Sequence, residues 1–269
     1  MHVEAVGGER PRLLLSADAT DPAATSNALG ALQPIVDRVL RRELAGPNDW
    51  LLPSPAPVEL AVHAAYNPER VSQYNIVPGL MGVVLTMTMV LITALAITRE
   101  SERGTMETLL ATPVQPVEVT LGKIVPYVLV GYLQAGLILL AARHLFQVPM
   151  TGSVPLLAAV MLVFILANLA IGITFSTIAQ NQLQAMQMGF FFFLPSILLS
   201  GFMFPFRGMP VWAQYVGEVL PLTHFLRIVR GVLLKGNGLA AIAPEIGPIA
   251  LFAVVVLAIA LTRFRQTLD

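Results

Sequence analysis

The chain has 269 residues, of which 56% are hydrophobic and 12% are charged. Soluble globular proteins contain about 25% charged residues, so this composition indicates an integral membrane protein and excludes an ordinary soluble domain. The formal net charge is zero and cysteine is absent, which leaves no bulk charge to attract nucleic acid and excludes disulfide bonds and thiolate metal sites.

Residues 1–75 have ordinary polarity and predict a small α+β module outside the bilayer. Residues 12–16 and 58–65 predict strands, and the second of them alternates apolar and polar side chains. Between the strands, Asp21 can cap a helix that has Pro22 at its first position and runs to Leu44. Such a module has a weak core of its own, so we expect it to pack on the membrane part or on further sequence.

From residue 76 onward the sequence contains five apolar stretches that are long enough to cross a bilayer. Each has at least about 17 residues, which at a rise of about 1.5 Å per residue approaches or exceeds a hydrocarbon core about 30 Å thick. None of them contains Asp, Glu, Lys or Arg. The stretches are residues 76–98, 124–142, 154–178, 186–204 and 246–262. We therefore predict an all-α polytopic membrane domain over residues 76–269.

The segment of residues 99–123, between the first two stretches, is too polar to insert. Each charged residue at bilayer depth costs about 2.5–3.5 kcal/mol on insertion scales, so the segment must lie on one aqueous face. Its first part predicts a short amphipathic helix that ends before Pro113, with Met106, Leu109 and Leu110 on one side. A helix continuous with a membrane span can transmit force from a soluble partner. The alternative is a solvated charge cluster at the membrane edge.

A few polar or small residues interrupt the predicted spans. Asn168, Gly172 and Ser176 recur every four residues on the third span, a pattern that lets helices approach closely and exchange hydrogen bonds. Gln134 on the second span and Gln187 on the fourth are single amides. We interpret these residues as part of helix packing or of a translocation path, and helix packing is the simpler interpretation.

The runs that follow the fourth span are too short and too polar to cross the membrane, and they predict helices at the interface. Four apolar side chains can form a stripe opposite Arg227 and Arg230, namely Phe225, Ile228, Val229 and Val232. The alternative is an amphipathic surface loop. Glu245, at the start of the last span, is expected to complement the positive end of that helix.

Motifs for catalysis, metal binding or nucleotide binding are absent from the sequence. The four histidines are scattered without the spacing of metal ligands, and no Gly-x-Ser-x-Gly elbow occurs. The pair Gly122-Lys123 is not a phosphate loop, because Val117 replaces its first glycine and Ile124 its Ser or Thr. We predict no catalytic residue, no metal and no cofactor.

Five short motifs follow one another along residues 66–269. They are Ile76–Leu80, Arg99–Val114, Gly122–Lys123, Leu194–Pro205 and Pro221–Gly236. In this order they resemble the ABC-2 type permeases, the membrane subunits of bacterial ATP-driven exporters. The resemblance implies that the charged segment is a cytoplasmic coupling helix, which docks on a separate ATP-binding cassette ATPase subunit. It also implies that the region after the fourth span forms short re-entrant helices, which dip into the outer leaflet and close the outer end of the path.

The resemblance assigns two sets of residues. The implied coupling residues are Arg99, Glu100, Glu102, Arg103, Gly104, Thr105, Glu107, Leu109, Leu110 and Pro113. The implied outer-gate residues are Phe204, Pro205, Pro221, His224, Arg227 and Arg230. We expect a second permease copy or paralogue as a partner, the bacterial cytoplasmic membrane as the location, and residues 1–75 on the extracytoplasmic side.

The front of the chain departs from the family pattern. ABC-2 permeases usually begin with a cytoplasmic tail and a first span, whereas Met1 opens inside what resembles the external domain. We expect an upstream start or a truncated, inactive fragment, and the alternative is that residues 1–75 are translocated unaided. Two other function classes remain open. One is a membrane protein without transport activity, such as an assembly factor or a lipid-modifying protein. The other is an ATP-independent channel or carrier, which the lack of charge within the spans disfavours.

Overall fold

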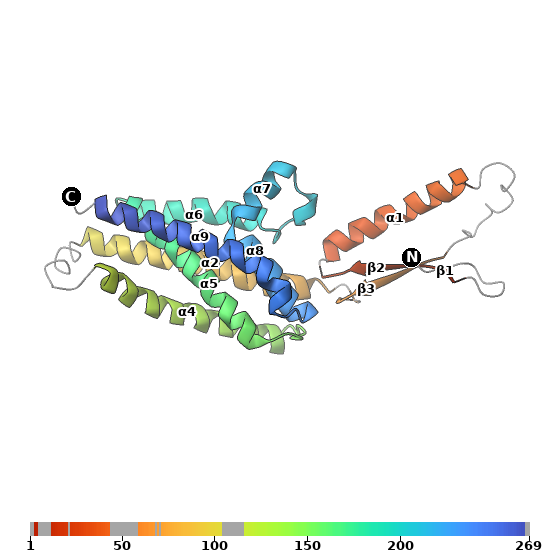
Figure 1. The fold of residues 1–269 in the computed structure, drawn as a ribbon, viewed down its shortest axis with the longest axis horizontal. Helices are drawn as coiled ribbons and strands as arrows, with labels where there is room; N and C mark the ends of the chain where they lie inside the picture. The colour runs from red at the N-terminus through yellow and green to blue at the C-terminus, as the bar shows by residue number, and fades with distance from the viewer. Residues whose placement is uncertain are drawn as a thin grey trace. The chain divides into compact units, whose positions relative to one another are not determined.

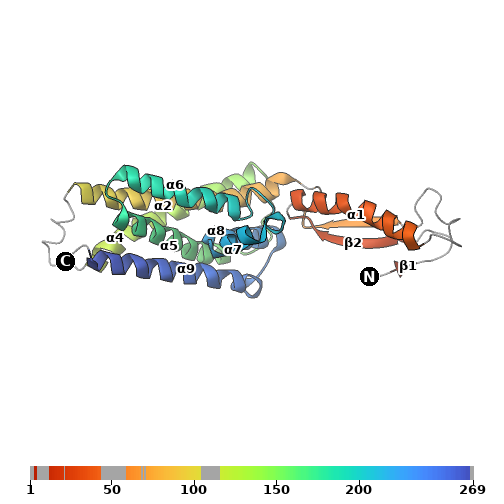
Figure 2. The same ribbon diagram turned by 90° about the horizontal axis from the view of Figure 1, so that it is seen from above.

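The computed structural model describes residues 3–4, 12–20, 22–43, 59–67, 69, 71–103 and 116–266. The chain divides into two compact units, Met1–Asn75 and Ile76–Asp269. Their elements are drawn in Figures 1 and 2.

The described part of the first unit is a three-stranded sheet with one helix (Figure 1). Strands β1 (Val3–Glu4), β2 (Arg12–Asp18) and β3 (Glu59–Ala65) lie in that order. β1 is antiparallel and β3 parallel to β2, and helix α1 (Pro22–Glu43) connects the two parallel strands, as a parallel pair requires. The predicted strands and helix are present with bounds within two residues. β1 was not predicted, and Asp21, the predicted cap, lies outside the described residues.

Within the described residues, the second unit contains five helices that are long and apolar enough to cross a membrane. They are α2 (Ser72–Glu102), α4 (Pro116–His144), α5 (Val154–Ile178), α6 (Gln182–Leu199) and α9 (Leu239–Gln266). Figures 1 and 2 show them side by side along the unit. The prediction of five helices with the length and composition of membrane spans is confirmed, and α5 has the predicted bounds.

The fourth span differs from its predicted bounds of 186–204 at both ends. α6 begins early because the side chain of Asn181 caps it, accepting a hydrogen bond of 2.9 Å from the Gln184 amide. It ends at Leu199 because Gly201 has a φ of 82°, which breaks the helix. Phe204, placed on this span by the sequence, therefore lies in the connection that follows it.

Helix α5 lies at the centre of the second unit and packs against α4, α6, α8 and α9. Its Phe164 ring stacks on Phe225 of α8, with ring centroids 3.9 Å apart. It also meets α2 at Gly172, where an added Cβ would lie 2.7 Å from the Cβ of Thr93 and 2.8 Å from the Val90 carbonyl oxygen. Large apolar side chains and close approaches between helices, such as this one, thus make the core.

Three short elements follow α6: η2 (Phe206–Gly208), α7 (Val211–Val219) and α8 (Pro221–Lys235). α7 projects from the bundle near the end of α6 (Figure 1). It exposes Trp212 and Tyr215, side chains of the type that is enriched at membrane–water interfaces.

The prediction that α8 is an amphipathic helix on the membrane interface is wrong. Of its 15 residues 12 are buried, including the predicted apolar stripe, which packs into the core of the bundle. The loop before α5 is fastened to the same helix, since the amide and hydroxyl groups of Thr151 both donate to the Leu233 carbonyl at 3.0 Å. α8 is therefore a structural part of the bundle rather than a surface loop.

Candidate functional site

The predicted coupling residues that the structure describes lie at the end of α2. Arg99, Glu100 and Glu102 extend the apolar helix without a break, and Arg103 follows it. The carboxylate of Glu102 accepts a hydrogen bond of 2.8 Å from the backbone amide of Gln182 and a second one from the side-chain amide of Gln182. The end of α2 is thereby tied to the start of α6. Gly104, Thr105, Glu107, Leu109, Leu110 and Pro113 lie outside the described residues.

The polar residues of the predicted path form contacts between and within helices. The side-chain amide of Gln134 on α4 donates to the Thr88 hydroxyl on α2 at 3.0 Å. Ser176 donates to the Ile173 carbonyl at 2.6 Å, and Gly172 forms the close approach to α2 described above. Gln187 on α6 is exposed on the surface of this single chain. These contacts fit helix packing for three of the predicted residues.

Asn168 is fully buried and donates to the Phe164 carbonyl at 2.8 Å, while its side-chain oxygen has no hydrogen-bond partner among the described residues. The side-chain oxygen of Gln134 is likewise buried without a partner among them. The same holds for the buried hydroxyl oxygens of Thr86 and Thr93 on α2. The interior of the bundle therefore contains polar atoms that apolar packing alone does not satisfy.

The predicted outer-gate residues divide between a loop and a buried helix. Phe204 is exposed and Pro205 half-buried in the connection after α6, whereas Pro221 is the first residue of α8. Arg230 on α8 donates to the Gly201 carbonyl at 3.2 Å, which joins α8 to the turn that ends α6. His224 and Arg227 belong to a larger cluster.

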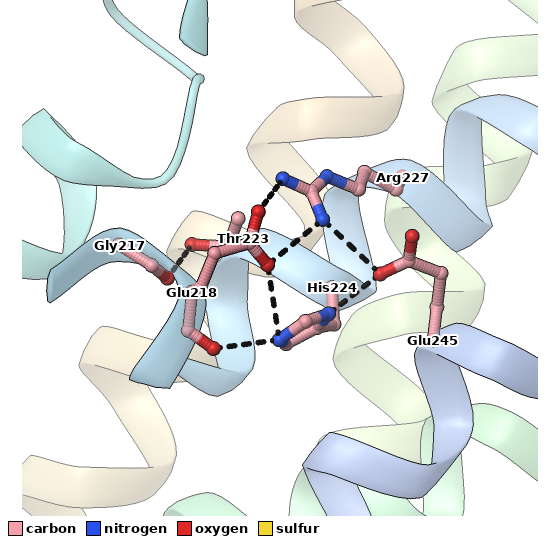
Figure 3. A network of polar contacts seen from close by, with 6 residues as sticks. All are labelled: Gly217, Glu218, Thr223, His224, Arg227 and Glu245. Carbon is pink, nitrogen blue, oxygen red and sulfur yellow. Dashed lines mark hydrogen bonds and ion pairs between the residues drawn. The ribbon is translucent and has the colours of Figure 1, made fainter. Parts of the chain in front are cut away.

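Four residues from three helices form this cluster, here called the gate network: Glu218, His224, Arg227 and Glu245 (Figure 3). The Nδ1 atom of His224 lies 2.5 Å from Oε2 of Glu245, and its Nε2 atom lies 2.8 Å from the backbone carbonyl oxygen of Glu218. The histidine of α8 therefore contacts both α7 and α9.

Arg227 reinforces the same two connections. Its guanidinium group donates to both carboxylate oxygens of Glu218, at 3.0 and 2.6 Å, and reaches Glu245 at 3.4 Å. It also lies over the ring of Phe206, 4.7 Å from the ring centroid. Next to it, the Thr223 hydroxyl donates to the Gly217 carbonyl at 2.6 Å (Figure 3). α7, α8, α9 and η2 are thus held together by polar contacts at one end of the bundle.

Burial and neighbouring charges shift the pKa of His224 in opposite directions. The side chain is only 6% exposed, and burial alone would lower the pKa of the imidazole. The hydrogen bonds to Glu245 and to the Glu218 carbonyl, together with the charges of the two carboxylates, outweigh burial and raise this pKa above its ordinary value. The protonated form of His224 is therefore favoured.

The prediction that Glu245 complements the positive end of the last span is wrong. Because α9 begins at Leu239, Glu245 lies in the second turn of the helix, where it faces His224 and Arg227. It also lies between two prolines of the helix, Pro244 and Pro248. Glu218, Thr88 and Gln182 were not singled out from the sequence either, because each gains its role from a partner at least nine residues away.

Among the described residues, no group of three His, Cys, Asp or Glu side chains is placed to hold a metal ion. In the gate network itself, the space between the carboxylates is occupied by the guanidinium group and the imidazole. The geometry fits charge pairing between helices rather than chemistry on a bound ion.

Comparison with known proteins supplies a family for this arrangement. The family model described as "ABC-2 family transporter protein" matches residues 4–262. The match begins near the start of the first unit and ends within the last long helix, so it extends over nearly the whole chain.

Three Escherichia coli (strain K12) proteins illustrate the similarity. The probable multidrug ABC transporter permease YbhR is 30% identical over 254 residues, which cover 94% of this chain and 68% of YbhR. The inner membrane transport permease YhhJ is 29% identical over 272 residues, which cover 98% of this chain and 70% of YhhJ. The probable multidrug ABC transporter permease YbhS is 37% identical over 173 residues, which cover 64% of this chain and 46% of YbhS.

Proposed function

Because this chain belongs to the ABC-2 family of transporter proteins, as the membrane permease component that works with a separate ATPase subunit, we propose that it exports hydrophobic compounds across a bacterial cytoplasmic membrane. The working unit would contain two permeases, identical or paralogous, and two ATP-binding subunits. The similarity to permeases named as multidrug and inner-membrane transporters supports the substrate class and the location.

The proposed coupling element is the segment that begins at Arg99. The observation that carries this proposal is the continuity of α2, which runs as one helix from the apolar span to Glu102. Movement of a docked ATPase would be passed directly into that span. The contact of Glu102 with Gln182 would carry the same movement into α6. With this end in the cytoplasm, Ser72 and the unit that precedes it lie on the extracytoplasmic side.

The proposed outer gate is the set of short elements held by the gate network. α7 and α9 are both joined to α8 by charged contacts, so separating them requires breaking several hydrogen bonds at once. In the switch to outward exposure, we expect α7 to move away from α8. The exposed aromatic side of α7 would stay in the outer interface of the bilayer during this movement.

The coupling proposal can be tested by charge reversal in the permease reconstituted with its ATPase subunit. Substituting Lys for both Glu100 and Glu102 should abolish the stimulation of ATP hydrolysis by the permease while leaving membrane insertion intact. Arg143→Glu, an exposed charge at the end of α4, is the matched control and should preserve stimulation. Normal stimulation in the double variant would contradict the coupling role.

A further inference from the structure

His224 has acceptor atoms at both of its ring nitrogens. Nδ1 faces a carboxylate oxygen of Glu245, and Nε2 faces the backbone carbonyl of Glu218, which cannot donate. A neutral imidazole has only one N–H group and could satisfy only one of these oxygens. The imidazolium ion has two N–H groups and satisfies both.

The charges of the gate network lead to the same protonation state. With both carboxylates ionised and Arg227 charged, an imidazolium makes the sum of the four charges zero. Loss of its proton would leave two carboxylates sharing one guanidinium group, with a ring nitrogen lone pair directed at an oxygen. Like charges and facing lone pairs both disfavour that state in a partly buried site.

The remaining elements around α8 supply no other titratable group that could take over this role. α5 and α6 contain no Asp, Glu, Lys, Arg, His or Tyr. α2 meets α8 at Gly79 and Gly82. Glu218 from α7, Arg227 from α8 itself and Glu245 from α9 are therefore the charged groups that the structure places against His224.

We propose that His224 is a proton-binding site of the outer gate, occupied when the gate is closed and emptied when it opens. The site joins α7 to α9 only while the imidazole is doubly protonated. When α7 moves away, His224 is exposed to water and loses its two acceptors, so its proton affinity falls toward that of an ordinary histidine, with a pKa of about 6.5. Opening then releases the proton, and by linkage a rising pH favours opening. The gate itself rests on the proposed function.

A thiol probe can measure the opening of this gate. The chain has no cysteine, so Ala213→Cys, on the buried side of α7, introduces a single thiol that is covered until α7 moves. Gly238→Cys, at an exposed position with open space around it, reports the intrinsic pH dependence of the maleimide reaction. Both variants are labelled in nanodiscs that contain the ATPase subunit. The labelling rate of Ala213→Cys divided by that of Gly238→Cys, here called the labelling ratio, measures how often the gate is open.

Without nucleotide, this ratio should rise with pH above about 6.5, by at most about tenfold per pH unit, because one proton is released. His224→Gln should make the ratio independent of pH, whereas His144→Gln, at the exposed end of α4, should keep the dependence. A pH-independent ratio in the chain with His224, or an unchanged dependence in His224→Gln, would overturn the proposal.

A second measurement uses the unsubstituted chain, so it does not require that a variant folds. In the chain labelled with ¹⁵N-histidine, one of the four imidazoles should remain doubly protonated to a higher pH than the others. Four signals that titrate together would overturn the proposal. Addition of ATP tests the proposed gate separately from the proton site. If ATP changes the labelling ratio and pH does not, the proposal of a proton site is wrong and the proposed function stands. If pH changes the ratio and ATP does not, the proton site stands and ATP-driven opening of the gate is wrong.

Discussion

The Nδ1 atom of His224 and the Oε2 atom of Glu245 lie 2.5 Å apart, although the two residues belong to different helices and are separated by 21 positions. The same carboxylate oxygen is also within 3.4 Å of Arg227. The Glu245 carboxylate of α9 therefore contacts two cationic side chains of α8, His224 and Arg227. Its removal should affect the molecule more than the number of its own contacts suggests.

We first predict that Glu245→Gln destabilises the chain more than Glu218→Gln. Glu245→Gln keeps an oxygen that can accept from His224 but removes the charge, so a charge-assisted hydrogen bond of the buried imidazole becomes a neutral one, a loss of about 1–2 kcal/mol. Glu218→Gln removes a more exposed ion pair, which is worth less than about 1 kcal/mol, and its backbone carbonyl still accepts from His224. Thermal unfolding of both variants in detergent measures the difference. Equal losses would show that His224 does not depend on Glu245.

The stability of the chain should fall as pH rises, and His224 should account for part of this fall. Its pKa is raised in the folded state, so its contribution is fully present below the unfolded pKa of about 6.5 and is lost as pH rises through the folded pKa. The unfolding midpoint of the unsubstituted chain should therefore decrease more between pH 6 and pH 9 than that of His224→Gln. Parallel decreases would contradict this assignment.

The crossing of α2 and α5 predicts opposite results for two glycines. Gly172→Ala would bring a methyl group against the Cβ of Thr93 and the Val90 carbonyl, so we expect a loss of about 1–3 kcal/mol through overpacking. Gly136→Ala on α4 has open space around the new atom and should be neutral or slightly stabilising. Unfolding measured for the two variants side by side checks this. A well-tolerated Gly172→Ala would favour a path position over helix packing.

The contact of Gln134 with Thr88 should behave as a hydrogen bond between helices. A double-mutant cycle of Gln134→Leu and Thr88→Val should give a coupling energy of about 0.6 kcal/mol, the average for such bonds in membranes. Gln187→Leu, at an exposed position on α6, should show no coupling to Thr88→Val. If the coupling is absent but transport falls in Gln134→Leu, Gln134 acts on the path.

The spans could be predicted because membrane insertion depends on long apolar stretches, which are local properties of a sequence. α5 keeps its predicted bounds, since it is mostly apolar without a charged residue, and the Ser153 hydroxyl caps its start by accepting a hydrogen bond from the Leu156 amide. The end of α6 could not be placed, because it depends on the left-handed conformation of Gly201 within an otherwise apolar run. Backbone conformation at one residue decided that boundary.

The candidate site was only partly predictable for a different reason. His224 and Arg227 were assigned to the outer gate through a family resemblance, but the apolar stripe of α8 with two arginines opposite it indicated an interfacial helix. The structure buries the stripe against α5 and α9, and it neutralises Arg227 with Glu218 and Glu245. Partners from separate helices are set by tertiary packing, which periodicity does not reveal.

The two prolines beside Glu245 have a mechanical consequence for α9. Neither Pro244 nor Pro248 can donate a backbone hydrogen bond, so the first turns of the helix are joined less tightly than the rest. This part of the helix can bend at little energetic expense while its longer remainder keeps its packing on α5. α9 is therefore a stiff helix that can bend near its start, and the carboxylate of Glu245 lies on the segment that bends.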